Sequence, residues 1–397
     1  MPISGRLPDD DAGHDRIGTA GDRVFDIEAT SGMSVPIIIM SFDRPEYLER
    51  FCVSLREQVG FDLDENLIHL MQDGGRSRRT GCVYANEEAL DASAAVFKRH
   101  FPHSHLHRAE ENLGIAMNFE RAEKFAFQNL GADVAYFFED DMELGPYYLH
   151  ILDRMRAAGQ DCPNLGYFAC YGDIYRGFDA KHAKIVPLEH HWGFGLTRRC
   201  WEAMQGWIAP FYEIYRHTDY KFRPHLTILR QFLTKDVAWG ETSQDVIKTA
   251  ACASLGFARI NTDVCFARYI GVQGQSFNEQ TFKELGYDRA PLIVEKPDSL
   301  EAITEPLLAQ FAVGKRRAMA EFRVRELDAR IADWSRRMFE PDRMASREDI
   351  DGLWKLIMDR LPGEDFYERN VGKRSVRGIR SELLRSAEGR GKSFYFG

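Results

Sequence analysis

Short apolar runs recur along the first third of the chain, and the segments between them have helical spacing. Strands that recur about every 30–37 residues with helices between them are typical of βαβ units in a doubly wound sheet. The predicted strands are Val35–Phe42, Leu67–Gln72, Ser104–Arg108 and Asp133–Phe138, with helices to about Val59, over Glu87–His100 and from Asn112 to about Asn129. The sequence therefore predicts an α/β fold, a Rossmann-like, mostly parallel doubly wound sheet.

Acidic residues follow three of these strands. Asp43, Asp73 and the triplet Glu139-Asp140-Asp141 each come directly after an apolar run. Sheets of this kind bind ligands beyond the carboxyl ends of their strands, so we expect these side chains at the ligand edge. Asp43 and Glu46 also form a D-x-x-E capping box, which predicts that a helix opens there.

The acidic triplet is the sharpest chemical signal. Adjacent carboxylates repel one another, and hard cations such as Mg²⁺ or Mn²⁺ prefer carboxylate oxygens. One of the three acids would suffice as a metal ligand beside substrate phosphates. The alternative is an acidic turn that interacts favourably with the N-terminus of the following helix.

The segment Asp73-Gly74-Gly75 indicates either part of a nucleotide-binding site or an ordinary turn. A carboxylate there could accept hydrogen bonds from a base or ribose, and the glycines would let a ligand approach; a strand followed by D-G-G is also a common turn. The run from Gly74 to Gly81 matches neither the P-loop nor the dinucleotide-binding pattern.

Candidate groups also occur in the second half of the fold. Ser243-Gln244-Asp245 heads an apparent helix, where Ser243 or Asp245 could be an N-cap and Asp245 could instead be a general base. Asp219 and Asp263 are further acidic candidates. A further group is His190 and His191, beside Trp192 and Phe194. The two histidines could be ligands or part of a wall on which a sugar stacks, and the four residues could equally form a local aromatic core.

Composition divides the chain into three parts. Residues 1–33 are polar and lack periodicity, which predicts a flexible N-terminal arm; residues 34–295 would form the α/β domain. Residues 296–397 form a helical, basic C-terminal region, with candidate helices Ala302–Leu308, Arg316–Met338, Asp349–Leu361 and Ser375–Ser386. From Ala312 onward there are 20 Lys and Arg against 15 Asp and Glu. This region could be a solvated helical face, or it could bind an anionic partner such as a lipid headgroup or a polyphosphate surface. It could also form homo-oligomers or grip an acceptor.

The overall charge and the cysteines indicate which binding partners and which cellular compartment to expect. A net charge of −9 argues against a nucleic-acid partner. Seven scattered cysteines without C-x-x-C pairs signal neither a disulfide framework nor a structural zinc site. The longest apolar run, Pro36–Met40, is too short for a membrane helix. We therefore expect a cytoplasmic protein, with peripheral binding at the inner face of a membrane left open.

Together these segments resemble nucleotide-sugar-dependent glycosyltransferases of the GT-A fold, and among them the N-acetylglucosaminyltransferase I type. The likeness covers roughly residues 35–285. It rests, in order along the chain, on Pro36–Arg44, Met71–Gly75, Phe138–Glu143, Trp192–Thr197 and Gly271–Asn278.

The resemblance implies roles for individual residues. Asp141, in a DXD-like motif, would bind Mn²⁺ (or Mg²⁺) bridging the donor diphosphate, while Glu139 and Asp140 orient the sugar and ribose. Asp73 would hydrogen-bond the uracil of a UDP-sugar. Further donor-binding residues would be Ser41, Arg44, Trp192 and Gly193, and the catalytic base would be Asp245, with Asp219 or Asp263 as alternatives.

The resulting hypothesis is a metal-dependent inverting glycosyltransferase that moves a sugar, with GlcNAc as the first to test, from a UDP-sugar to a hydroxyl of a glycan or other acceptor. The alternatives are a non-catalytic nucleotide-sugar or glycan-binding subunit and a sugar nucleotidyltransferase. The latter needs a Gly-rich loop with a basic residue after the first strand, and Ser41–Pro45 contains no glycine.

Overall fold

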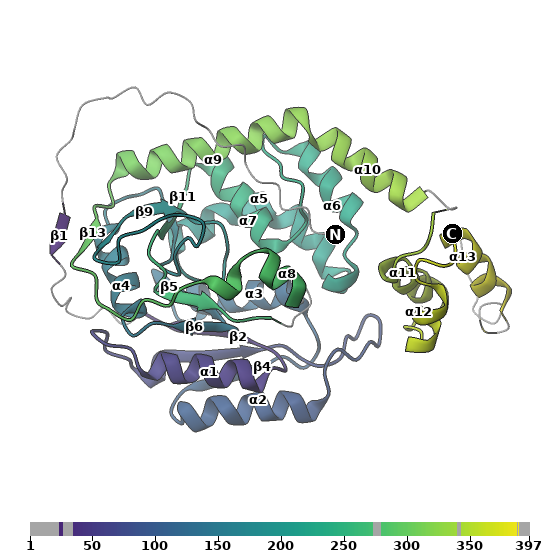
Figure 1. Cartoon of the computed structure of the whole chain (residues 1–397), viewed down its shortest axis with the longest axis horizontal. Coiled ribbons are helices and arrows are strands. Elements are labelled where there is room, and N and C mark those ends of the chain that lie inside the picture. The colour runs from purple at the N-terminus through teal and green to yellow at the C-terminus, as the bar shows by residue number, and fades with distance from the viewer. Residues whose placement is uncertain (1–23, 27–34, 273–278, 340–342, 387, 389–397) are drawn as a thin grey trace.

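The computed structural model describes the chain except residues 1–23, 27–34, 273–278, 340–342, 387 and 389–397. Its centre is an eight-stranded sheet with the order β4-β3-β2-β5-β10-β7-β11-β9 (Figure 1). These strands are β2 (Ile37–Ser41), β3 (Ile68–Gln72), β4 (His105–Arg108), β5 (Val134–Glu139), β7 (Leu165–Phe168), β9 (Ile185–Pro187), β10 (Gly193–Thr197) and β11 (Ala258–Thr262).

The first four strands of this sheet are parallel. β2 pairs in parallel with both β3 and β5, and β3 pairs in parallel with β4. β10 runs antiparallel to β5 and β7, and β9 runs antiparallel to β11. The chain builds β2, β3 and β4 in one direction and then returns to add β5 on the other side of β2. The predicted α/β fold with a mostly parallel, doubly wound sheet is confirmed, and its switch point lies between β2 and β5.

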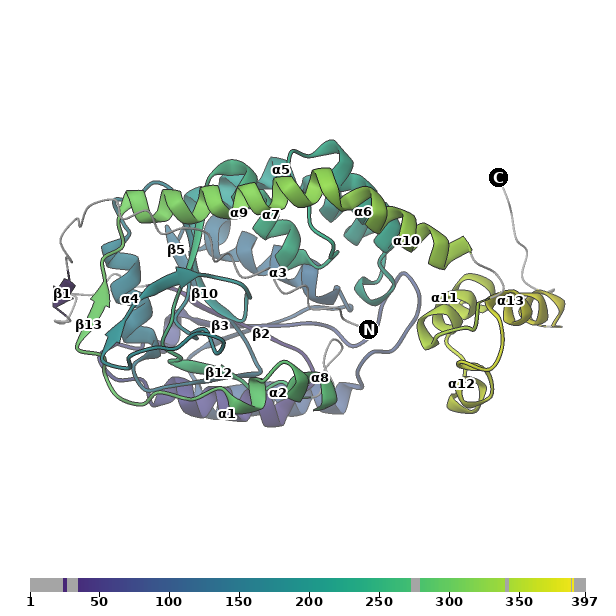
Figure 2. The same cartoon turned by 45° about the horizontal axis from the view of Figure 1, so that its top comes forward.

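Helices cover both faces of the sheet (Figures 1 and 2). α1, α2 and α4 lie on one face, and α3, α5 and α7 on the other. Successive side chains of β5 follow this division, because Phe138 packs against Phe51 of α1 and Phe137 against Phe127, which follows α3. The bounds are α1 (Pro45–Arg56), α2 (Glu87–His100), α3 (Gly114–Lys124), α4 (Tyr148–Ala158), α5 (Arg198–Arg216) and α7 (Gln244–Leu255).

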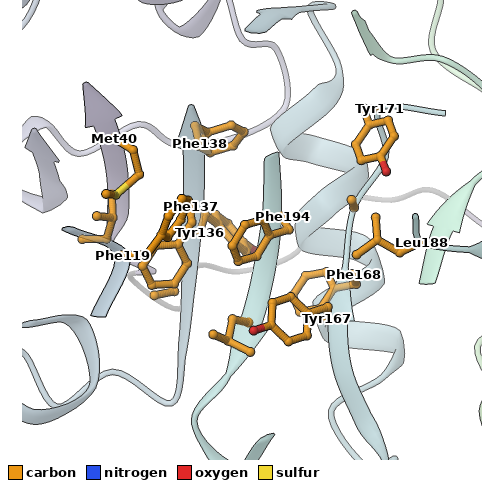
Figure 3. Packing of buried hydrophobic residues seen from close by; sticks show 14 of the residues in the cluster. Met40, Phe119, Tyr136, Phe137, Phe138, Tyr167, Phe168, Tyr171, Leu188 and Phe194 are labelled. Atoms are coloured by element: carbon orange, nitrogen blue, oxygen red, sulfur yellow. The ribbon is translucent and has the colours of Figure 1, made fainter. Parts of the chain in front are cut away.

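Aromatic side chains fill the core between the sheet and these helices (Figure 3). The Phe194 ring of β10 lies 5.4 Å from Phe137 of β5 and 5.2 Å from Tyr167 of β7, between ring centroids. β2 and β3 are buried at every position, as expected for parallel strands covered on both faces. This packing holds the ends of β2 and β5, where the acidic residues lie, in one place.

The predicted capping box at the start of α1 does not form. Arg44, and not Asp43, occupies the N-cap position, and no side chain caps the helix there. Pro45 at the first position of α1 needs no hydrogen-bond partner for its nitrogen and starts the helix by its fixed φ angle. The polar residues of this turn are therefore available for other contacts.

The first part of the C-terminal region differs from the prediction. One helix, α9 (Glu305–Arg325), spans the gap between two predicted helices, and α10 (Leu327–Phe339) follows it. Gly314 does not end α9; a Cβ there would meet no neighbouring atom. Leu308 and Met319 of α9 are buried in the same core as the sheet. The predicted boundary near residue 295 therefore does not coincide with the edge of this core.

The last three helices form a separate core. They are α11 (Arg347–Met358), α12 (Glu364–Asn370) and α13 (Val376–Arg385), of which α12 was not predicted. Ile350 and Ile379 are fully buried between them. Beyond the end of α10 in Figure 1 these helices form a small unit, which we call the C-terminal unit. We propose that the domain boundary lies between the two cores.

The remaining elements are short. β1 (Val24–Asp26) lies in the segment expected to be a flexible arm and pairs with β13 (Ser299–Glu301), which also pairs with β8 (His182–Ala183). β6 (Met142–Leu144) pairs with β12 (Ala267–Tyr269). The others are α6 (His225–Gln231), α8 (Glu279–Glu284), η1 (Glu65–Leu67), η2 (Phe125–Asn129), η3 (Tyr220–Phe222), η4 (Phe232–Thr234) and η5 (Tyr287–Arg289). Within the described residues, no helix combines the length and apolarity needed to cross a membrane.

Candidate active site

Polar side chains from β2 and β5 contact one another at the switch point of the sheet. Ser41 ends β2 and Arg44 precedes α1; Glu139 ends β5, and Asp140 and Asp141 form the turn that follows. The guanidinium of Arg44 pairs with both aspartates, at 2.5 Å to Asp140 and 2.8 Å to Asp141. Open α/β sheets bind ligands at this place. The structure thus brings these five predicted residues together at the ligand edge.

The carboxylate of Asp140 is used inside the protein. It is 1% exposed and accepts hydrogen bonds from Ser41 Oγ (2.9 Å) and the backbone N–H of Phe42 (3.3 Å), besides Arg44. These donors take most of its acceptor capacity. Asp140 therefore ties the end of β2 to the end of β5, and its contact with a sugar or ribose stays a prediction.

Asp141 has one carboxylate oxygen without a partner. Oδ2 accepts from Arg44 at 2.8 Å, whereas Oδ1 is buried and has no hydrogen-bond donor among the described residues. Burial raises the pKa of Asp141, and Asp140 adds to this rise, whereas the charge of Arg44 lowers it. A buried acceptor left unsatisfied costs free energy, so this oxygen fits a cation or a donor supplied by a ligand.

Burial and charged neighbours both affect the pKa of Glu139. Burial raises its pKa well above the ordinary value, the negative charges of Asp141 and Asp245 add to the effect, and Arg44 opposes it. Its backbone N–H donates to the carbonyl of Trp192 at 2.9 Å. Glu139 therefore lies between the acidic turn and α7, and its raised pKa favours a protonated carboxyl.

Asp245 lies in the first turn of α7 and faces this cluster closely enough to raise the pKa of Glu139. Ser243 occupies the N-cap position but makes no capping hydrogen bond through its side chain. In the part of the chain that the structure describes, no hydrogen bond or ion pair involves the carboxylate of Asp245. An unpaired carboxylate at this edge is chemically able to accept a proton.

The aromatic loop before β10 forms a stack rather than an open wall. Trp192 lies between His190 and Tyr269, with ring centroids 4.3 and 4.6 Å away and interplanar angles of 8° and 12°. Because both faces of the indole are covered, only its edge is left for a ligand. Of the three interpretations offered by the sequence, this geometry favours a local aromatic core.

Gly193 lies within the sheet. It pairs with Phe138 across β10 and β5, and its carbonyl accepts from the hydroxyl of Tyr148 at 3.1 Å. A Cβ here would lie 3.0 Å from the Phe138 ring. The close approach of these side chains explains the glycine, and a contact with the donor stays a prediction.

Asp73 binds the start of α3. Its carboxylate accepts from the backbone N–H groups of Gly74, Leu113 and Gly114 at 2.8–2.9 Å, and from Asn112 Nδ2 at 3.2 Å. Burial raises the pKa of Asp73 to about 6, although the backbone donors act in the opposite direction. All its acceptor positions are occupied, so a hydrogen bond to uracil would have to replace one of these contacts.

The two alternative bases have internal partners. Asp219 accepts from Ser77 Oγ and from Tyr84 and Thr80 hydroxyls, and these bonds outweigh burial and lower its pKa. Asp263 accepts from the backbone N–H of Lys184 at 2.7 Å. In contrast to Asp245, both carboxylates hold loops in place.

The sequence did not single out two tyrosines of the site. Tyr269 contacts Asp141, and this carboxylate together with burial raises the tyrosine pKa. Tyr220 accepts from the backbone N–H of Gln244 through its hydroxyl, at 3.2 Å. Gly271 lies close to both Tyr269 and Asp141, since a Cβ there would lie within 2.6 Å of both the Tyr269 hydroxyl and Asp141 Oδ2. Residues 273–278 of the segment Gly271–Asn278, on which the family resemblance partly rests, lie outside the described residues.

Within the described ranges, no group of three or more His, Cys, Asp or Glu side chains could hold a metal ion. A cation at this edge would therefore rest on Asp141 and on oxygens from outside the protein. Mg²⁺ and Mn²⁺ sites of this kind are common, because these ions keep several waters and share substrate phosphates. The partnerless Oδ1 of Asp141 fits such a ligand.

No family model matches the chain, and no curated protein does. Among solved structures, it is similar to the mannosyltransferase PcManGT from Pyrobaculum calidifontis in complex with GDP-Man and Mn²⁺ (12% identity, TM-score 0.32, 89% of this chain and 70% of that chain). It is also similar to S. aureus TarS 1–349 in complex with UDP-GlcNAc (12%, 0.36, 92% and 94%). A third is the apo-form glycosyltransferase GlyE of Streptococcus pneumoniae (12%, 0.31, 77% and 64%). At this level of similarity, function has to be argued from the chain's own site.

Proposed function

We propose that the chain is a nucleotide-sugar-dependent glycosyltransferase of the GT-A type, which transfers a sugar from a UDP-sugar to an acceptor hydroxyl. One observation carries the proposal. At the switch point of a doubly wound sheet, a buried carboxylate oxygen without a partner, Asp141 Oδ1, belongs to the same charged cluster as the unpaired carboxylate of Asp245. Asp141 Oδ1 is suited to a cation at the diphosphate of the donor, and the carboxylate of Asp245 is suited to accept the proton of the acceptor hydroxyl.

On the donor side, Asp141 would hold Mn²⁺ or Mg²⁺, and Arg44 would stand beside it as a second positive charge. When bound, the metal would neutralise charge on the diphosphate. Glu139, Asp140 and the backbone near Trp192 line the same edge. UDP-GlcNAc is the first donor to test, because the sequence resembles the N-acetylglucosaminyltransferase I type.

On the acceptor side, Asp245 would act as general base. It takes the proton of the acceptor hydroxyl while that oxygen attacks the anomeric carbon, and the nucleoside diphosphate leaves from the opposite face of the sugar. This single displacement inverts the configuration at the anomeric carbon. The carboxylates of Asp219 and Asp263 are less suited to take this proton, since both accept hydrogen bonds from within the protein.

Donor binding is tested by thermal unfolding with UDP, in Mn²⁺ or in EDTA. A ligand at a hundredfold excess over its dissociation constant stabilises the folded state by about 2.7 kcal/mol. We expect UDP to raise the melting temperature only with Mn²⁺, and we expect Asp141→Asn to abolish that rise. A rise that EDTA and Asp141→Asn both leave intact would contradict the metal site. No rise with any nucleotide would favour a glycan-binding subunit.

The base is tested with Asp245→Asn. Because a general base acts only in the reaction, we expect turnover to fall by about 10²–10⁴-fold while the UDP-dependent thermal shift is kept. Glu202→Gln, at an exposed acid of α5, is the control and should keep most of the activity. Full activity in Asp245→Asn would show that another group is the base.

We further propose that the region after residue 295 provides the contacts with partners, at the cytoplasmic face of a membrane or between copies of the chain. The excess of basic residues supports the first, and the separate core of the C-terminal unit supports the second. Vesicle flotation at low and high salt tests the former, since screening must weaken an electrostatic contact. Sedimentation velocity tests the latter.

A further inference from the structure

Three cations gather around one aromatic turn, the helix η3. Lys221 belongs to η3, Arg223 follows it, and Lys355 reaches it from α11 of the C-terminal unit. The Nζ atoms of Lys221 and Lys355 lie 6.0 and 5.8 Å from the centre of the Phe222 ring, and the guanidinium of Arg223 lies 4.4 Å from the centre of the Tyr220 ring. We call Lys221, Arg223 and Lys355 the cationic junction.

Within the part of the chain that is described, none of these cations has a carboxylate partner. Arg223 donates only to neutral oxygens, those of Tyr220 and Thr242. Two arginines in helices of the C-terminal unit differ, because Arg347 pairs with Glu364 and Arg369 with Asp365. Three like charges around one turn repel one another, and an anion bound among them would offset this repulsion.

Lys355 gives the strongest indication of a missing partner. Its Nζ is shielded from solvent, yet no hydrogen-bond acceptor among the described residues contacts it. A charged amine removed from water without a partner is costly, whereas an anionic ligand would make the same position favourable. The contact between Lys355 and Phe222 also links the C-terminal unit to the α/β domain.

The cationic junction adjoins the acceptor side of the proposed active site. Arg223 Nε donates to the carbonyl of Thr242 at 3.1 Å, and the Tyr220 hydroxyl accepts from the backbone N–H of Gln244. Asp245 is the next residue. The donor side is built from other elements, the ends of β2 and β5 with Arg44.

We propose that the cationic junction binds a phosphate group carried by the acceptor. The substrate that receives the sugar is then a phosphate-bearing glycan or polymer, and this inference rests on the proposed transferase function. Three positive charges around one turn match the charge and the several oxygens of a phosphate better than a single carboxylate. The phosphate would neutralise Lys355 and hold the acceptor hydroxyl near Asp245.

The binding experiment uses the full chain and inorganic tripolyphosphate as the probe, titrated calorimetrically with and without saturating UDP. We expect binding in both cases, weakened about tenfold in Lys355→Met because one charge-assisted contact is lost. Lys181→Met, an exposed lysine outside the junction, is the matched control and should bind as the unchanged chain does. Equal affinity in Lys355→Met, or complete displacement by UDP, would overturn the assignment.

Thermal unfolding without any ligand separates binding from a structural role. Since Lys355→Met removes a charge that is shielded from solvent and has no hydrogen-bond acceptor among the described residues, we expect its melting temperature to equal or exceed that of the unchanged chain. A lower melting temperature together with unchanged probe affinity would identify Lys355 as a structural lysine and overturn the proposal.

The last arm distinguishes an acceptor phosphate from free phosphate. Transfer is measured to a sugar phosphate and to the same sugar without phosphate, and we expect a KM at least about tenfold lower for the phosphorylated acceptor, a preference that Lys355→Met reduces. Equal KM values for the two acceptors would mean that the cationic junction binds free phosphate and not a phosphate of the acceptor, which would overturn the proposal. Loss of UDP binding would instead contradict the proposed function, whatever the probe does.

Discussion

At the scale of single residues, Arg44 decides the electrostatics of the site. It is the cation that contacts the two buried carboxylates of Asp140 and Asp141. Arg44→Met would leave both carboxylates without a counter-charge, and we expect a loss of about 2–4 kcal/mol in the free energy of unfolding, measured by urea denaturation. Arg44→Lys keeps the charge but not the fork of two donors, so its loss should be smaller.

The same variant tests the cation site. Because Mn²⁺ at Asp141 would replace part of the missing charge, we expect Mn²⁺ to raise the melting temperature of Arg44→Met more than that of the unchanged chain. The same rise in both proteins, or an Arg44→Met variant as stable as the unchanged chain, would show that Arg44 does not balance this pair of acids.

At the scale of elements, a buried ion pair ties α3 to α7. Lys248 of α7 contacts Glu123 of α3, and the two side chains are 1% and 2% exposed. Asp245 lies one helical turn before Lys248, so this pair sets how α7 presents the proposed base. Lys248→Met alone should cost about 3–5 kcal/mol of folding free energy, because the buried Glu123 loses its ion-pair partner.

The double variant Lys248→Met/Glu123→Leu provides the control. It removes both charges, and we expect it to recover most of the lost stability in a double-mutant cycle measured by urea denaturation. Losses that simply add would show that the two side chains do not act as a pair.

At the scale of the whole molecule, buried histidines make the fold sensitive to acid. Burial and the neighbouring His107 and His105 lower the pKa of His69 to about 4. Burial also lowers the pKa values of His107, His150, His190, His191 and His225. Between about pH 6.5 and pH 4 the unfolded chain binds more protons than the folded one, so stability falls as the pH falls through this window.

For His69 the arithmetic gives a measurable effect. We expect it to contribute a loss of about 2 kcal/mol between pH 7 and pH 5, and His69→Gln should reduce the loss by a similar amount in urea denaturation at the two pH values. His182→Gln, at an exposed histidine, should leave the pH dependence unchanged. A His69→Gln variant with the full acid dependence would place its origin elsewhere.

Local signals were enough for much of the fold. The apolar runs of β2, β3 and β5 and the helical spacing of α2 and α7 predicted element types correctly, because buried parallel strands and amphipathic helices carry their own periodicity. The errors fell where periodicity is weak. The region from Ala302 to Met338 was divided wrongly, since Gly314 is a poor helix former that the long helix α9 nevertheless tolerates at an exposed position.

For the candidate site, the sequence by itself determined which residues stand at the ends of strands, since a strand's end can be recognised from its own residues. The strand pattern placed Asp43, Asp73 and Glu139–Asp141 at one edge of the sheet. Only the tertiary structure decided what each carboxylate contacts. Asp73 and Asp219 are occupied by donors from distant loops, and Trp192 is covered by His190 and Tyr269. Hydrogen-bond saturation depends on partners far away in the chain, which no local pattern records.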